Sequence, residues 1–127
     1  DLSIFVGLAS AAGAIETDAG GENWEDALGF YIVEGAASQD IVVLGASGDT
    51  EATTSLSTDL GNSYVVLSLH FDGTQVEAYV NGVLTATITS GLPNDGTVLF
   101  PTISASTRDA GGGDDLFCDY VRVCQER

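Results

Sequence analysis

The chain has 127 residues, of which 44% are apolar, and it carries nineteen acidic residues against three arginines and no lysine, for a formal net charge of −16. This length suffices for one domain with a hydrophobic core, and the apolar content excludes a disordered tail. Nucleic acids and anionic membranes are bound through clustered Lys and Arg, so we expect neither as a partner. No apolar run reaches the roughly twenty residues that a membrane span needs. We therefore expect one soluble domain over residues 1–127.

The many acidic side chains repel one another, because few positive charges lie among them. The repulsion is offset by salt, by bound divalent cations or by a partner surface of opposite sign, as in a saline habitat or a larger assembly. The alternative is that the charge serves solubility alone.

The first half of the chain predicts four strands with polar or glycine-containing connections. Residues 2–8, 28–34 and 40–46 are apolar and partly β-branched, and residues 50–57 are rich in Thr and Ser. Residues 15–26 predict an acidic loop that contains Trp24. Because a strand begins at once, we expect the sandwich to be incomplete at its N-terminal edge.

Residues 63–89 predict three consecutive antiparallel strands joined by two tight turns. Asp72-Gly73 and Asn81-Gly82 are dipeptides that supply the positive φ angles of a type I′ turn. Two-residue loops then fix the register, which pairs Leu69 with Val76 and places His70 opposite Gln75.

This register divides the meander into two faces. The predicted core face consists of Val65, Leu67, Leu69, Phe71, Thr74, Val76, Ala78, Val80, Val83, Thr85 and Thr87. The opposite face mixes aromatic, polar and aliphatic groups, so we expect it to be partly wet or to meet a partner. It consists of Tyr64, Val66, Ser68, His70, Gln75, Glu77, Tyr79, Leu84, Ala86 and Ile88.

The last third of the chain predicts two more strands. Residues 98–104 form a strand that Pro101 restricts to an edge or a bulge, and residues 116–123 form the closing strand after an acidic loop at 108–115. Eight or nine short strands without a helix favour an all-β, antiparallel two-sheet sandwich.

Five segments occur in the order found in one family of sandwiches. They are Val-Gly-Leu-Ala at 6–9, Leu-Gly-Phe at 28–30, the Asp-Gly and Asn-Gly double hairpin, Leu-Pro at 92–93 and Asp-Tyr-Val-Arg-Val at 119–123. Together they resemble concanavalin A-like lectin/glucanase jelly rolls, in particular the structural modules of tailed-phage virion proteins. The resemblance implies a jelly roll over residues 7–127. Such modules usually have more sequence ahead of the first strand, so either those strands are missing or a neighbouring subunit completes the sheet.

The same resemblance implies a non-catalytic virion component, either a capsid decoration or cement protein or a module of a tail or fibre protein. It would be assembled in the host cytoplasm and would lie on the surface of the extracellular particle. Its partners would be further copies of the chain, as trimers, and other virion proteins. Because the family also contains sugar binders and enzymes, the alternatives are a carbohydrate-binding module for host or environmental polysaccharide and a hydrolase relic.

Catalysis would require paired carboxylates beside a cleft. The glucanases of this family carry Glu-x-Asp followed by a second Glu. Glu16 and Asp18 begin that pattern, but Gly20 and Gly21 occupy the positions of the second Glu. The single histidine, His70, has no Ser or Cys placed beside it to form a triad. We therefore expect no enzymatic activity.

Two sets of residues are candidate binding sites. Sugar recognition uses aromatic faces beside planar polar groups. The candidates for a carbohydrate or partner face are Tyr64, His70, Gln75, Glu77, Tyr79 and Trp24. Calcium is held by carboxylate oxygens in loops, and the candidate Ca²⁺ ligands are Asp109, Asp114 and Asp115, with a second acidic loop at Glu16, Asp18, Glu22 and Asp26. The alternatives are aromatic side chains that pack against a neighbour and acidic side chains that are solvated.

Overall fold

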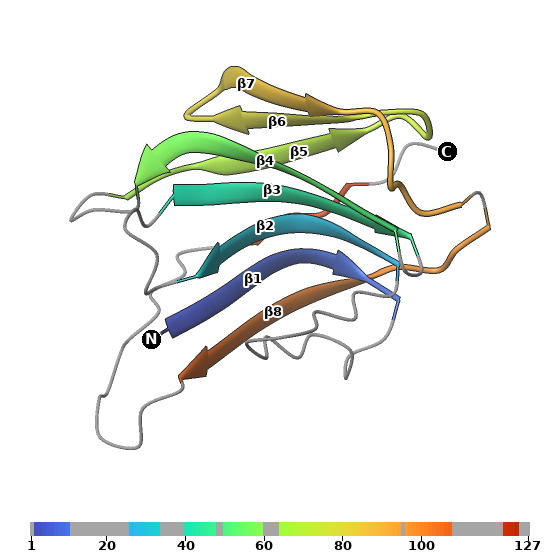
Figure 1. Ribbon diagram of the computed structural model, residues 1–127, viewed down its shortest axis with the longest axis horizontal. Helices are drawn as coiled ribbons and strands as arrows, with labels where there is room; N and C mark the ends of the chain where they lie inside the picture. The colour runs from blue at the N-terminus through green and yellow to red at the C-terminus, as the bar shows by residue number, and fades with distance from the viewer. Residues whose placement is uncertain are drawn as a thin grey trace.

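The computed structural model describes residues 2–10, 26–33, 40–47, 50–59, 64–94, 96–107 and 121–124. Within these ranges it is all-β, with eight strands (Figure 1). The strands are β1 (Leu2–Ala9), β2 (Ala27–Val33), β3 (Asp40–Ser47), β4 (Thr50–Asp59), β5 (Leu67–Phe71), β6 (Val76–Val80), β7 (Val83–Ile88) and β8 (Phe100–Thr107). None of the described residues belongs to a helix that could cross a membrane.

The strands form two antiparallel sheets. One has five strands in the order β4-β3-β2-β1-β8, and the other has three in the order β5-β6-β7. β1 pairs with β2 on one side and with β8 on the other. The expectation of an open sheet edge at the N-terminal strand is therefore wrong, because β1 has a neighbour on both sides. Within the described ranges, the edges of the larger sheet are β4 and β8. Of the predicted closing strand, residues 116–120 lie outside the described residues and residues 121–124 form no strand.

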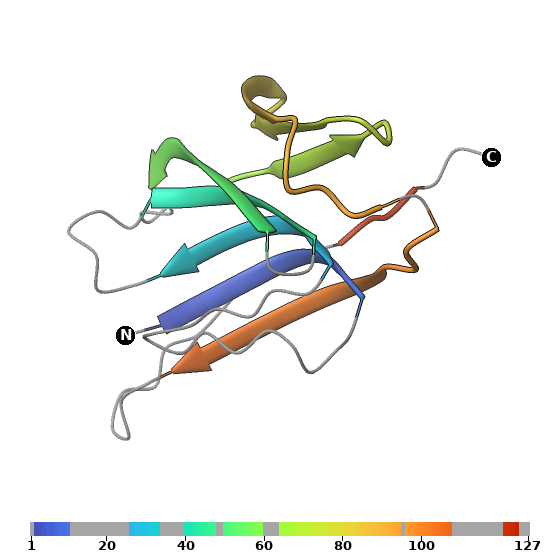
Figure 2. The ribbon, with the colours of Figure 1, turned by 45° about the vertical axis from the view of Figure 1, so that its right-hand side comes forward.

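The three-stranded sheet lies next to the β4 end of the larger sheet in both views of the ribbon (Figure 1 and Figure 2), and β7 contacts β4. Apolar side chains from both sheets fill the layer between them, so the described strands form a two-sheet sandwich. The buried members of this core are Ile4, Leu28, Phe30, Ile32, Ile41, Val43, Leu56, Val76, Ala78, Ala86 and Ile88.

The five-stranded sheet also buries side chains on its other face. Successive side chains of a strand point to opposite faces, so β1 sends Ile4 into the core between the sheets and Phe5 into a second cluster. This second cluster consists of Phe5, Ala9, Ala27, Tyr31, Leu44 and Ala46. The middle strands of the sheet are thus apolar on both sides, as in strands that are covered on both faces.

A pair of glycines makes room for Phe5 in that second cluster. Gly7 and Gly29 are directly opposite each other in β1 and β2. A Cβ atom added to Gly29 would lie 2.5 Å from Cε2 of Phe5 and 2.8 Å from the carbonyl oxygen of Val6. Real Cβ atoms do not approach other atoms so closely, so a side chain at Gly29 requires the ring or the backbone to move.

We therefore predict that Gly29→Ala destabilises the fold by about 1–3 kcal/mol, because it overpacks a buried site. Urea unfolding followed by circular dichroism measures this loss. In a Phe5→Leu background, which shortens the side chain that the new methyl group meets, the same substitution should cost less. An equal cost in both backgrounds would contradict the contact with Phe5.

The hairpin between β5 and β6 turns over four residues instead of the predicted two. Leu69 lies opposite Ala78 and Leu67 opposite Val80, whereas the predicted partner of Leu69 was Val76. The pairing is shifted by two residues, and a shift of two leaves every side chain on its predicted face. Val76 and Ala78 are accordingly fully buried.

The hairpin between β6 and β7 has the predicted tight turn. Asn81 and Gly82 have φ angles of 51° and 80°, as a type I′ turn requires, and Val80 pairs with Val83. Asn81 also continues the ladder to β5: its N–H donates to the carbonyl oxygen of Val66 at 2.8 Å, and its Oδ1 accepts from the N–H of Val66 at 3.0 Å. This residue therefore closes one hairpin and holds the start of the other.

A β-bulge follows this turn. Tyr79 pairs with Leu84, but its neighbour Ala78 pairs with Ala86, so Thr85 is an extra residue in β7. Thr85 turns its hydroxyl back to donate to the carbonyl oxygen of Val83 at 3.0 Å.

The bulge reverses the predicted faces of β7. Ala86 and Ile88 are 9% and 4% exposed and belong to the core, whereas Val83 is 67% exposed and Thr85 and Thr87 are also exposed. The prediction that Thr85 and Thr87 continue the core face is wrong, because one extra residue turns each following side chain to the opposite face. Val83 precedes the bulge and pairs with Val80, but it is exposed at the end of the hairpin and does not join the predicted core.

Candidate functional site

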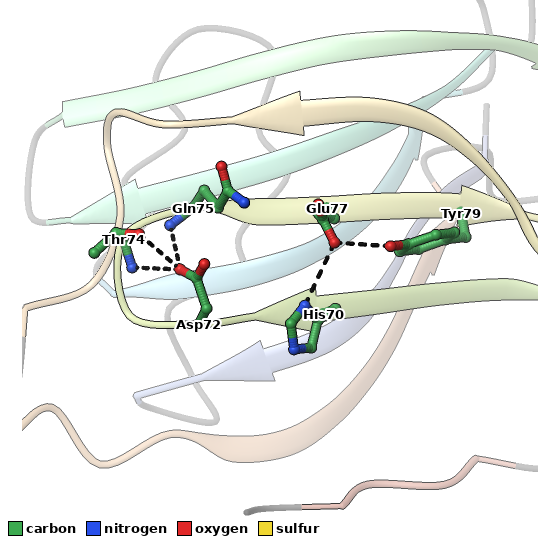
Figure 3. A network of polar contacts seen from close by, with 6 residues as sticks. All are labelled: His70, Asp72, Thr74, Gln75, Glu77 and Tyr79. Atoms are coloured by element: carbon green, nitrogen blue, oxygen red, sulfur yellow. Dashed lines mark hydrogen bonds and ion pairs between the residues drawn. The ribbon is translucent and has the colours of Figure 1, made fainter.

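Three of the predicted site residues lie together on the outer face of the three-stranded sheet. His70 in β5 is directly opposite Glu77 in β6, and Tyr79 is two residues further along β6 on the same face (Figure 3). The predicted register had placed His70 opposite Gln75, so the four-residue loop is what brings His70 and Glu77 together.

One carboxylate oxygen connects the three side chains. The Tyr79 hydroxyl donates to Oε2 of Glu77 at 2.7 Å, and Nδ1 of His70 lies 3.4 Å from the same oxygen (Figure 3). The hydrogen bond to Glu77 raises the pKa of Tyr79 above its usual value, aided by desolvation and by the negative charge of Glu77. The His70 side chain is 62% exposed and that of Glu77 is 24% exposed. The row therefore presents an imidazole, an oriented carboxylate and a phenol on an open surface.

The other predicted site residues do not join this row. Tyr64 precedes β5 and is 84% exposed, and Gln75 belongs to the β5–β6 loop, where its backbone N–H donates to Asp72. Trp24 and the expected calcium ligands Asp109, Asp114 and Asp115 lie outside the described residues, as do Glu16, Asp18 and Glu22. In the described ranges, which include Asp26, no group of three His, Cys, Asp or Glu side chains could hold a metal ion.

Asp72 organises the loop that sets this register. Its Oδ1 accepts three hydrogen bonds, from the N–H and the hydroxyl of Thr74, both at 2.8 Å, and from the N–H of Gln75 at 2.9 Å. Gly73 supplies the positive φ of 91° that the chain needs between them. The sequence signal for this loop is an Asp followed by Gly and Thr, since Asp side chains cap the backbone two residues on.

The same hydrogen bonds lower the pKa of Asp72 below its ordinary value of 3.8, those from Thr74 contributing most. A carboxyl group whose pKa is lower in the folded than in the unfolded protein stabilises the fold above its unfolded pKa. This stabilisation is lost as the pH falls through the folded pKa.

We predict that Asp72→Asn, which keeps the oxygen and removes the charge, lowers the melting temperature at neutral pH. The difference from the unmodified protein should shrink as the pH falls below 3.8 and Asp72 itself becomes neutral. Thermal unfolding at a series of pH values measures both proteins. Asp72→Ala, which also removes the acceptor, should remain destabilised throughout, and a difference for Asp72→Asn that does not change with pH would refute the role of the charge.

A second candidate surface lies at β8, the edge of the five-stranded sheet. Phe100 pairs with Ala9 and Ile103 pairs with Val6, so the two side chains point to opposite faces of the sheet. They are 56% and 48% exposed, and Val98 just before the strand is 66% exposed. The edge position predicted from Pro101 is confirmed among the described strands, but β8 was not predicted to be a site. The signal was the apolar run at residues 98–101 and the absence of charge over residues 96–107.

Comparison with known proteins gives no relative of this chain. No family model matches it, and neither the curated proteins nor the solved structures contain a match.

Proposed function

We propose that this protein is a non-catalytic structural component of a phage virion, either a capsid decoration or cement protein or a module of a tail or fibre protein. The proposal combines the resemblance to concanavalin A-like jelly rolls of phage virions with one structural observation. This observation is the edge strand β8, which exposes apolar side chains on both of its faces.

Such an edge favours a protein partner. Full burial of a Val, Ile or Phe side chain stabilises by about 1.5–3 kcal/mol, so covering side chains that are half exposed gains on the order of 1 kcal/mol each. The unpaired backbone of an edge strand adds hydrogen bonds when a further strand is placed beside it. A net charge of −16 disfavours phosphate backbones and anionic lipid as the alternative partners.

The direct test is whether the protein co-sediments with virus particles. Purified virus-sized particles from the source sample are separated on a density gradient, and peptides of this chain are identified by mass spectrometry. We expect these peptides in the same band as other structural proteins and expect them to persist after nuclease treatment. Peptides found only in the soluble fraction would refute the proposal, and purified protein loaded without particles serves as the control for self-sedimentation.

The second candidate function is carbohydrate binding at the outer face of the three-stranded sheet. It is favoured by the row of His70, Glu77 and Tyr79, in which the carboxylate is held by the tyrosine hydroxyl at 2.7 Å. An oriented carboxylate beside an aromatic ring suits the hydroxyl groups and the apolar face of a sugar.

A glycan array with the purified protein tests this candidate. If the row binds sugar, Tyr79→Ala should reduce saturable binding at least tenfold, which corresponds to a loss of about 1.4 kcal/mol. Tyr79→Phe, which keeps the ring, should reduce it less. Val83→Ala changes an exposed residue that pairs with Val80, whose side chain alternates with that of Tyr79 and so points to the other face, and it is the matched control. Absence of saturable binding to any glycan would refute this second function and leave the virion proposal unaffected.

A further inference from the structure

We propose that two copies of this protein associate through β8, with the two β8 strands antiparallel, so that their five-stranded sheets join into one continuous sheet. This inference rests on the proposed function as a structural component and names the first partner as a second copy of the chain.

β8 differs from β4 and β7, which are two of the other sheet edges among the described strands. β4, the opposite edge of the same sheet, has an irregular register near Asp40, a positive φ of 49° at Ser57 and a charged Glu51. β7 carries the bulge at Thr85. Bulges and charges of this kind prevent an edge strand from pairing with another chain.

β8 has almost none of these protections. It pairs with β1 in an unbroken register from Phe100 to Thr107, and residues 96–107 contain no Asp, Glu, Lys or Arg. Pro101 cannot donate a backbone hydrogen bond, but it is only the second residue of the strand, which leaves residues 102–107 able to pair.

β8 exposes one large apolar side chain on each of its two faces, and the other residues of the strand that share the face of Phe100 are uncharged Thr and Ser. Phe100 on one face and Ile103 on the other are each about half exposed. A strand placed about 4.8 Å beyond β8 would lay its own side chains next to both of them.

The absence of charge on β8 and the symmetry of an antiparallel strand pair favour a second copy of the chain as the partner. Two chains of charge −16 repel each other over most of their surfaces, so they approach most easily where both lack charge. An antiparallel pair of identical strands has a two-fold axis and satisfies both copies at once. Because salt shortens the range of the repulsion from about 10 Å at 0.1 M to about 3 Å at 1 M, the dimer should be more stable at high salt.

Sedimentation equilibrium of the full chain over a range of concentrations tests the proposal. We expect a monomer–dimer equilibrium whose dissociation constant falls at least tenfold between about 0.1 M and about 1 M NaCl. Ile103→Lys, which places a charge at the edge, should weaken the dimer at least tenfold. Val83→Lys, a substitution at a similarly exposed apolar residue on β7, should leave it unchanged.

Hydrogen exchange supplies a measurement that does not depend on a variant's stability. In the unmodified protein, amides of β8 should become more protected as the concentration rises, while those of β7 should not. Three results would overturn the proposal. They are a protein that stays monomeric at about 1 M NaCl, a trimer in place of the dimer, and equal weakening of the dimer by both lysine substitutions. Monomers that nevertheless sediment with particles would overturn this inference alone, whereas dimers absent from particles would leave it standing and refute the proposed function.

Discussion

The burial of β6 against the five-stranded sheet is the interaction that holds the two layers together. Val76 and Ala78 are completely buried and belong to the same core cluster as Val43 and other residues of the larger sheet. Because side chains alternate along a strand, this burial also decides what the other side of β6 can present. Glu77 and Tyr79 must point outward, so the polar row on the outer face is a direct consequence of the core.

The same alternation explains why the bulge at Thr85 is needed. Counted from the tight turn without a bulge, β7 would turn Val83, Thr85 and Thr87 inward and leave Ala86 and Ile88 in water. One extra residue at Thr85 reverses the faces of the residues that follow it, so that Ala86 and Ile88 enter the core and the threonines face solvent. Burial of an isoleucine is worth about 1.5–3 kcal/mol, which outweighs the loss of one ladder position.

Much of this architecture could be predicted from local patterns. Apolar and β-branched runs located six of the eight described strands within about two residues of each boundary, whereas β5 begins about four residues later than predicted and β8 ends about three later. Asn81-Gly82 predicted one turn because its φ angles are accessible to few other residues. The loop at Asp72 and the bulge could not be predicted from dipeptide preferences. Asp-Gly serves both a two-residue turn and a longer side-chain-capped loop, and the choice depends on Thr74 and Gln75 as hydrogen-bond donors.

The loop chemistry at Asp72 therefore determines the candidate site as well as the hairpin. With a two-residue turn, Leu69 would still face inward, because a shift of two keeps every side chain on its face. The core would tolerate either loop. On the outer face, however, His70 would move from Glu77 to Gln75 and the shared carboxylate oxygen would lose one of its two partners. Three hydrogen bonds to one exposed aspartate thus select between two registers that the buried residues alone do not distinguish.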